Sequence, residues 1–300
     1  MRAVWSFWSK PYRAGIGCRW RSELHHLLAW VLSVNTARRH YPETTLITDR
    51  LGKKLLVDQL GLPFAYVSTE LDRLAEADPG WWALGKLVAY SLQTEPFVHV
   101  DTDVFLWKPL PKTVSEAPVF TQCPESYANE AKPSLGEIEC VFHKTGQELP
   151  PEWKWVRSRA TGWFGEENCG ILGGCQVEFL CDYAHAAVDL ILAPEYAPVW
   201  SHLPDKFSHN FTVEQFYLWA RIEFYRCQRA PQYPGLRVNH LFSSVQEACD
   251  ANCARRLGFT HLWSDIKSHP AVATRLEQRV RHDYPDFYRR CERLISLAAK

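Results

Sequence analysis

The sequence lacks the surplus of basic residues that a polyanion-binding surface needs. Lys and Arg together number 34, as do Asp and Glu, so the formal net charge at pH 7 is zero. Proteins that bind nucleic acid through its phosphates concentrate positive charge. We therefore expect no nucleic-acid partner.

Long apolar runs are also missing. No stretch approaches the roughly 20 apolar residues that cross a bilayer. The first residues, MRAVWSFW, read as a strand and lack the apolar core and small-residue cleavage site of a signal peptide. These absences predict a soluble, cytoplasmic protein with no transmembrane segment.

The ten cysteines include no CxxC pair. Cys249 and Cys253 are the closest two and could together bind a zinc ion, although this is the less favoured interpretation. In a chain without an export signal, we expect reduced and mostly buried thiols.

Strand and helix patterns alternate along the first 110 residues, which is typical of an α/β protein with a parallel or mixed sheet. Apolar runs predict strands at 4–7, 44–48, 64–67 and 97–105, and helical spacing predicts helices at 23–39, 53–60 and 84–92. Residues 118–163 are rich in Pro, Glu and Trp and predict loops and short strands that cover a cleft. Further patterns predict helices at 177–192 and 212–221, a short apolar segment ending at Trp263, and a helical tail over 270–300 that restarts at Pro285.

The strand at 97–105 carries two acids, Asp101 and Asp103. Ionised carboxylates are costly to bury unless a positive charge compensates them. Alternation along a strand places both side chains on the same face. The pair therefore predicts a site for a hard divalent cation that holds a substrate phosphate, although solvated acids at a strand end give the same short motif.

A second pattern, His261 followed by Lys267, supplies complementary groups. A neutral imidazole is a good ligand for Mn²⁺-like ions, and a lysine offers a point charge to a phosphate. Taken alone, such a histidine is more often an ordinary surface or core residue.

An Asp-x-Asp after a strand near one third of the chain, followed much later by His-x5-Lys, resembles the GT-A glycosyltransferases, especially those of family 8. The resemblance implies an α/β fold with a GT-A (Rossmann-like) mixed central sheet flanked by helices over residues 1–267, and a C-terminal helical tail, 268–300, packed on it. It implies that Asp101, Asp103 and His261 bind Mn²⁺ (or Mg²⁺) and that Lys267 contacts the donor diphosphate. The family's usual Gly within this loop and Pro after the Lys are absent, and Asp265 is an additional acid.

Other segments resemble the same family. Lys86 lies in a segment similar to the helix whose basic residue reaches the donor, and Asn168 and Gly170 in one similar to the Asn-x-Gly segment that lines the sugar cleft. Glu214 and Gln215 are similar to the family's Asp-Gln pair, with Glu in place of Asp. An ordinary surface lysine, a Gly-rich turn and a helix N-terminal acid are the competing interpretations.

These parallels predict a metal-dependent, hexosyltransferase-like glycosyltransferase that moves a sugar from a nucleotide diphosphate donor, preferably a UDP-sugar, to an acceptor. Retention of configuration is favoured over inversion. Glu214 and Gln215 are the candidate catalytic residues. The candidate substrate-binding residues are Trp5, Ser6, Asp49, Lys86, Thr102, Asn168, Gly170 and Lys267.

Three alternatives stay open. A nucleotidyltransferase of related fold would carry a Gly-rich basic loop after the first strand, which Lys10, Arg13, Gly15 and Gly17 approximate only loosely. A non-catalytic nucleotide- or sugar-binding module would bind UDP with metal but transfer nothing. An aromatic-rich protein-binding module would need no metal.

Overall fold

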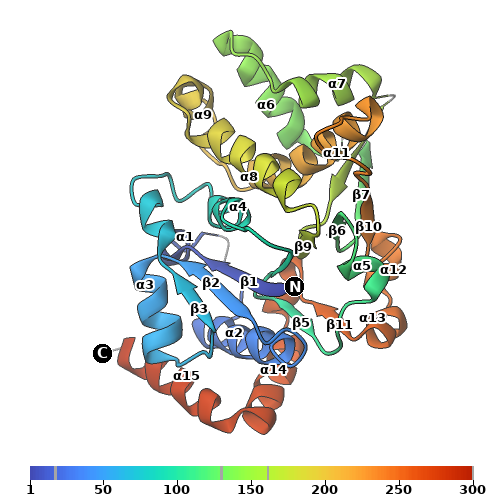
Figure 1. Ribbon diagram of the computed structural model, residues 1–300. Coiled ribbons are helices and arrows are strands. Elements are labelled where there is room, and N and C mark those ends of the chain that lie inside the picture. The colour runs from blue at the N-terminus through green and yellow to red at the C-terminus, as the bar shows by residue number, and fades with distance from the viewer. Residues whose placement is uncertain (17–18, 129–130, 161, 299–300) are drawn as a thin grey trace.

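The largest sheet has seven strands in the order β10-β6-β9-β4-β1-β2-β3 (Figure 1). The computed structural model describes residues 1–16, 19–128, 131–160 and 162–298. Its strands are β1 Arg2–Phe7, β2 Thr44–Thr48, β3 Tyr66–Ser68, β4 Phe97–Val100, β5 Val104–Leu106, β6 Val119–Thr121, β7 Pro124–Ala128, β8 Trp163–Glu167, β9 Ile171–Gly174, β10 Val238–His240 and β11 Phe259–His261.

The sheet is mixed because one strand runs against the others. β1 pairs in parallel with β2 and with β4, and β2 with β3. β9 is antiparallel to both of its neighbours, β4 and β6. Two small antiparallel ribbons, β5 with β11 and β7 with β8, complete the described strands. The predicted α/β class with a mixed central sheet is thus confirmed.

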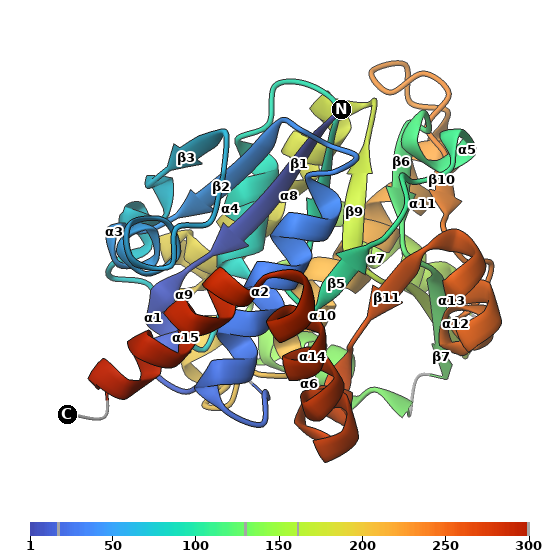
Figure 2. The ribbon, with the colours of Figure 1, turned by 90° about the horizontal axis from the view of Figure 1, so that it is seen from below.

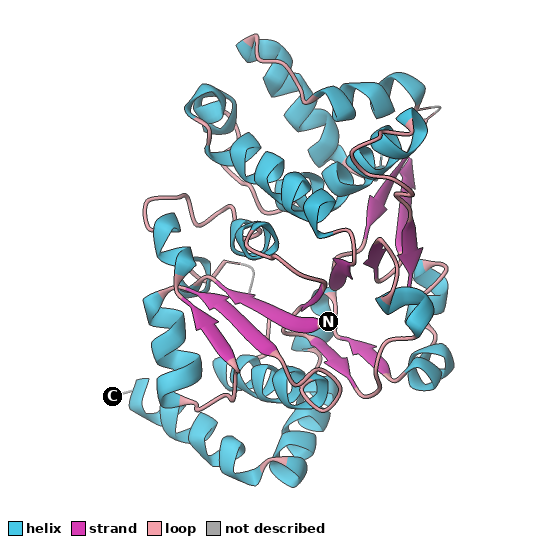
Figure 3. Ribbon diagram, viewed as in Figure 1, coloured by secondary structure: helices cyan, strands magenta, loops and turns pink. Residues whose placement is uncertain are grey.

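Helices cover both faces of the sheet (Figure 3). One layer contains α4 and α8, and the other contains α2 with the tail helices α14 and α15 lying across it (Figure 2). The α-helices are α1 Ser9–Arg13, α2 Glu23–Ala37, α3 Arg50–Lys53, α4 Leu84–Ser91, α5 Lys112–Ser115, α6 Pro133–Thr145, α7 Pro151–Arg159, α8 Val177–Leu192, α9 Ala197–Ser201, α10 His209–Phe211, α11 Tyr217–Gln228, α12 Val245–Cys249, α13 Ala251–Leu257, α14 Pro270–Asp283 and α15 Pro285–Ala298.

Each face of the sheet has its own apolar core. Successive side chains of β1 point to opposite faces, so Val4 packs in the core under α4 and α8. Trp5, its neighbour, packs in the core shared with α2, α14 and α15. The predicted helical tail, with its restart at Pro285, is confirmed.

The predicted single strand at 97–105 is wrong. β4 ends at Val100, and β5 begins at Val104 in a different sheet. The backbone N–H of Val104 donates to the carbonyl of Asp101 at 3.0 Å, so the chain turns between the two strands. Asp101 and Asp103 therefore lie in a turn at the carboxyl end of β4, and strand alternation does not orient them.

Three further expectations need correction. Residues 118–163 contain helices α6 and α7, not only loops and short strands. The strand expected at 64–67 begins two residues later, as β3. The described cysteines are free, but several of them, Cys140, Cys175, Cys227 and Cys249, are exposed, so the thiols are not mostly buried.

Among the described helices, none combines the length and apolar character needed to cross a bilayer.

Candidate functional site

The two acids and the late histidine meet because of strand pairing. In the β5–β11 ribbon, His261 lies opposite Val104, the residue that follows Asp103. The backbone N–H of Leu262 donates to the carbonyl of Asp103 at 2.9 Å and fixes this register. This pairing places a segment more than 150 residues downstream beside the turn that carries Asp101 and Asp103, called the acid turn from here on.

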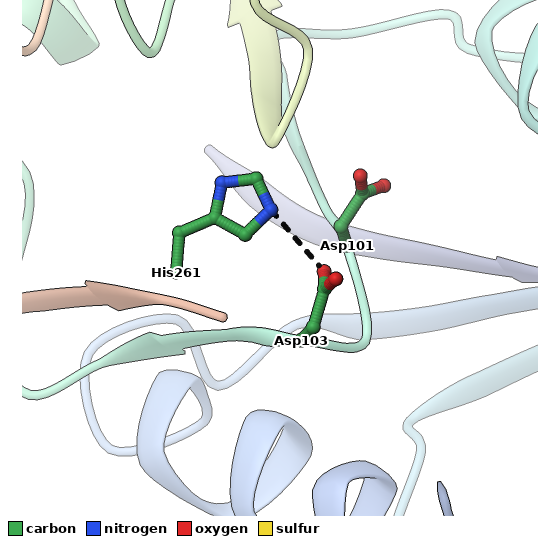
Figure 4. A group of neighbouring side chains, drawn as sticks. All are labelled: Asp101, Asp103 and His261. Carbon is green, nitrogen blue, oxygen red and sulfur yellow. Dashed lines mark ion pairs between the residues drawn. The ribbon is translucent and has the colours of Figure 1, made fainter. Parts of the chain in front are cut away.

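Asp101, Asp103 and His261 form a compact group of possible metal ligands. One ligand atom from each lies within 4.8 Å of the other two. His261 and Asp103 point toward each other, with Nε2 3.4 Å from Oδ1 (Figure 4). Two carboxylates and an imidazole are a suitable donor set for Mn²⁺, since oxygen ligands suit it and imidazole is tolerated.

Each carboxylate of this turn also has a lysine partner. Lys86 on α4 lies 3.0 Å from Asp101 and 2.8 Å from Glu214, measured from Nζ to carboxylate oxygens. It also donates to the carbonyl of Cys169 at 3.3 Å. Lys267 lies 2.5 Å from Asp103. An ammonium group thus lies next to each of the two carboxylates.

The surroundings shift the pKa values of Asp101 and Asp103 in opposite directions. Removal from water raises the pKa of Asp101 to about 6, and the nearby Lys86 charge offsets this only in part. Burial also opposes ionisation of Asp103, but the Lys267 charge, together with the neighbouring His261, outweighs burial and holds the pKa of Asp103 well below its usual range. Two acids in one turn therefore differ in their tendency to ionise.

These residues line a cleft made of two adjoining cavities. The smaller cavity, about 190 Å³, extends toward the end of β1 and includes Ser6 and Thr102. The larger cavity, about 450 Å³, extends toward β7 and α10. Both are lined by Trp82, Lys86, Asp101, Asp103 and Lys267, so the acid turn and its two lysines lie where they meet.

The larger cavity contains the remaining predicted residues of this site. Asn168, Gly170, Glu214, Gln215 and His261 all line it. The side chain of Asn168 donates to Glu125 at 2.6 Å and accepts from the backbone N–H of Gly170 at 3.1 Å.

Glu214 is fully buried, and only one of its two carboxylate oxygens has partners among the described residues. Its Oε1 pairs with Lys86 and accepts from the hydroxyl of Tyr90 at 3.0 Å. Its Oε2 is buried with no hydrogen-bond partner among the described residues. A buried carboxylate oxygen without a donor is costly, so its presence here calls for a functional explanation.

Two predicted residues do not line the cleft. Trp5 is fully buried, and its indole N–H donates to Ser33 at 3.0 Å, so it is a core residue. Asp49 caps α3 by accepting from the backbone N–H of Gly52 at 2.7 Å, and its other oxygen accepts from Ser9. It lines a separate cavity.

The basic residues near the first strand also lie apart from the acid turn. Lys10 and Arg13 line the same separate cavity as Asp49. The Lys10 ammonium donates to the carbonyls of Ala75 and Ala77 at 2.6 and 2.8 Å. Gly17 lies outside the described residues.

Sequence reasoning missed several polar groups at the site. Gln122 accepts from Nδ1 of His261 at 2.7 Å. His99 is buried on β4, contacts Ser6 at 3.0 Å and lines the smaller cavity. The sequence offers only a weak signal for Gln122, which directly follows β6 as Asp101 directly follows β4.

Comparisons with known proteins identify the family. A family model described as a family of unknown function (DUF6734) matches residues 1–294. The chain belongs to DUF6734. The acid turn, Lys86, Glu214, His261 and Lys267 all lie within the part that matches DUF6734. No curated protein matches the sequence.

Two solved structures show remote similarity. One is the galactosyltransferase LgtC in complex with donor and acceptor sugar analogs, with 10% sequence identity and a TM-score of 0.39 over 93% of this chain and 94% of that one. The other is mouse xyloside xylosyltransferase 1 in its apo form, with 10% identity and a TM-score of 0.31 over 87% and 96%.

Proposed function

We propose that this protein is a metal-dependent glycosyltransferase that uses a nucleotide diphosphate sugar, preferably a UDP-sugar. The observation that carries the proposal is the meeting of Asp101, Asp103 and His261 between two cavities, with Lys86 and Lys267 beside them. The strand-end Asp-x-Asp, the His-x5-Lys segment and their order along the chain resemble GT-A glycosyltransferases of family 8. The mixed sheet agrees with the fold that this resemblance implies.

The residues present fit a divalent cation. One ligand atom from each of the two carboxylates and the imidazole lies within 4.8 Å of the other two, a separation that a single divalent cation can bridge. Mn²⁺ or Mg²⁺ held there would neutralise the charge that builds on a leaving diphosphate. Asp101, Asp103 and His261 are the proposed ligands.

The lysines supply fixed positive charge to the same region. Lys267 is placed to meet a phosphate as a point charge, since its ammonium already lies against Asp103. Lys86 links Asp101 to Glu214 and so joins the acid turn to the larger cavity. We assign Lys86 and Lys267 to the donor, with Ser6 and Thr102 in the smaller cavity on the nucleotide side.

Glu214 and Gln215 are the proposed catalytic pair on the acceptor side. The free Oε2 of Glu214 suits a hydroxyl of the acceptor or of the transferred sugar. Asn168 and Gly170 line the same cavity and are assigned to the same side. We favour retention of configuration, and we assign residues 1–267 to the catalytic unit and residues 268–300 to a tail that supports it.

The test measures UDP release from a panel of UDP-sugars in the presence of Mn²⁺, with an acceptor panel. We expect release that EDTA abolishes. Asp103→Asn should lower turnover by about 10³-fold, equivalent to about 4 kcal/mol of lost charge stabilisation. The control is Asp189→Asn on the exposed side of α8, which should behave as wild type.

Two outcomes would reject the proposal. Pyrophosphate release from nucleoside triphosphates, without UDP release from UDP-sugars, would indicate a nucleotidyltransferase. Tight binding of Mn²⁺ and UDP without any transfer across the panel would indicate a non-catalytic binding module.

A further inference from the structure

The side chain of Gln122 is buried directly behind His261. Gln122 follows β6 and is only 1% exposed. Its backbone is held on both sides, because its N–H donates to the carbonyl of Asn168 at 3.0 Å and its carbonyl accepts from the N–H of Phe242 at 2.9 Å. These two bonds anchor the backbone of Gln122 to the segments that carry Asn168 and Phe242.

The contact between Gln122 and His261 selects one tautomer of the imidazole. Oε1 of Gln122 lies 2.7 Å from Nδ1 of His261, and an amide oxygen can only accept. The proton of a neutral ring then resides on Nδ1, and the lone pair resides on Nε2. Nε2 is the nitrogen that faces Asp103, at 3.4 Å.

Gly170 provides the space for this contact. A Cβ at position 170 would lie 2.4 Å from Oε1 of Gln122 and 2.6 Å from Nδ1 of His261. Any side chain there would push the glutamine and the histidine out of place. The absence of a side chain at 170 thus has a local reason, which is the close approach of the amide to the imidazole.

We propose that Gln122 is a positioning residue that orients His261 and sets its tautomer, so that Nε2 presents its lone pair to a cation bound by Asp101 and Asp103. This inference rests on the proposed function. Histidines that bind metals generally donate their other ring N–H to a neighbouring acceptor, and loss of that acceptor lowers metal affinity by about 10- to 100-fold. In this chain the acceptor is the side-chain amide oxygen of Gln122, which directly follows β6.

The first experiment measures Mn²⁺ affinity by titration calorimetry on the full chain, with Mn²⁺ alone as the probe. Gln122→Leu keeps the approximate size of the side chain but removes the acceptor. We expect the dissociation constant for Mn²⁺ to rise 10- to 100-fold. Gln122→Glu keeps an acceptor at the same place and should bind Mn²⁺ at least as tightly as wild type. The control, Gln93→Leu, changes another buried glutamine that contacts Ala89, and it should leave the affinity unchanged.

The second experiment reads the tautomer directly by ¹⁵N NMR of the metal-free protein at a pH where His261 is neutral. We expect the proton on Nδ1 in wild type and in Gln122→Glu, and loss of that preference in Gln122→Leu. This readout does not depend on metal or on turnover. It also remains informative if Gln122→Leu folds poorly, because wild type and Gln122→Glu can still be compared.

Two results would overturn the inference: a proton on Nε2 in wild type, or wild-type Mn²⁺ affinity in a folded Gln122→Leu. Failure of the proposed function looks different. Wild-type protein that binds Mn²⁺ but transfers no sugar would contradict the glycosyltransferase proposal and leave the role of Gln122 standing.

Discussion

At the scale of single residues, Lys86 holds together the half-buried carboxylate of Asp101 and the buried carboxylate of Glu214, which belong to different parts of the chain. Its side chain is 12% exposed, and burial would favour the neutral amine. The charges of Asp101 and Glu214 outweigh burial and raise its pKa above the usual value. The lysine is therefore a permanent cation, and the two acids depend on it.

Replacement of this cation should destabilise the fold. Lys86→Met leaves Asp101 and Glu214 without a counter-charge, and we expect a loss of about 3–5 kcal/mol in the free energy of unfolding. Urea denaturation at pH 7 measures it. Lys154→Met is the matched control, because Lys154 pairs with Glu148 at 2.6 Å on the surface, and its loss should cost less than about 1 kcal/mol. Equal effects of the two variants would contradict the role of Lys86.

His26 gives the fold a dependence on pH. Burial, aided by the nearby Lys267 charge, lowers its pKa to about 3, so the folded protein keeps the ring neutral. In the unfolded chain the His26 ring binds a proton at its ordinary pKa of 6.5, whereas in the folded protein it does so only near pH 3. Protons therefore favour unfolding between these two values, and the stability that is present above pH 6.5 is lost as the pH falls.

Between pH 7 and pH 5, His26 alone should lower the unfolding free energy by about 2 kcal/mol. Urea denaturation at both pH values, for wild type and His26→Gln, measures this contribution. The variant should lose about 2 kcal/mol less than wild type over the same interval. A parallel decline in the two proteins would show that His26 is not responsible.

At the scale of elements, the position of the acid turn depends on how tightly β9 packs against β4. Gly173 lies opposite Val98, and a Cβ there would lie 2.0 Å from the carbonyl oxygen of Phe97. The clash involves backbone, so no side-chain movement relieves it. β9 can approach β4 only because position 173 has no side chain.

Two Gly→Ala variants should therefore have opposite effects. Gly173→Ala should lower the free energy of unfolding by at least about 2 kcal/mol. Gly136→Ala lies in α6, where a Cβ meets nothing within 4 Å, and should raise it by about 0.5–1 kcal/mol through helix propensity. Thermal and urea denaturation check both. A neutral Gly173→Ala would mean that β4 and β9 are less closely packed than the structure shows.

Sequence patterns predict individual helices and strands with strong apolar periodicity better than they predict which strands pair with each other. The strands at 4–7 and 44–48 and the helices at 84–92 and 177–192 are found, because apolar spacing is a local signal. Helices α6 and α7 lie in the region whose Pro, Glu and Trp content predicts loops and short strands, and each begins with a proline, Pro133 or Pro151. Proline is compatible with the first position of a helix.

The candidate site was only partly accessible to sequence reasoning. Asp101, Asp103 and His261 could be named from residue type and motif order, but their meeting depends on the pairing of β5 with β11, a long-range contact that no local pattern encodes. Trp5 was misplaced because alternation along β1 does not tell which face meets the cleft. Gln122 was overlooked because a neutral amide becomes informative only when its partner is known.

At the scale of the whole molecule, the site joins segments that pack in different cores. The acid turn follows β4 in the centre of the sheet, Lys86 comes from α4 on one face, and His261 comes from β11, whose Phe259 packs in the core of the other face. A ligand held by all of them can bind only the folded chain. Such a ligand stabilises the fold as a unit.

Mn²⁺ together with UDP should therefore raise the melting temperature. At a hundredfold excess over the dissociation constant the gain is about 2.7 kcal/mol. For a chain of this size that corresponds to a shift of about 5 °C. Differential scanning fluorimetry should show the shift with both ligands, and EDTA should remove it. Asp103→Asn should show almost none, because it loses a proposed ligand of the cation that joins UDP to the protein. An undiminished shift in Asp103→Asn would place the binding site for Mn²⁺ and UDP away from the acid turn.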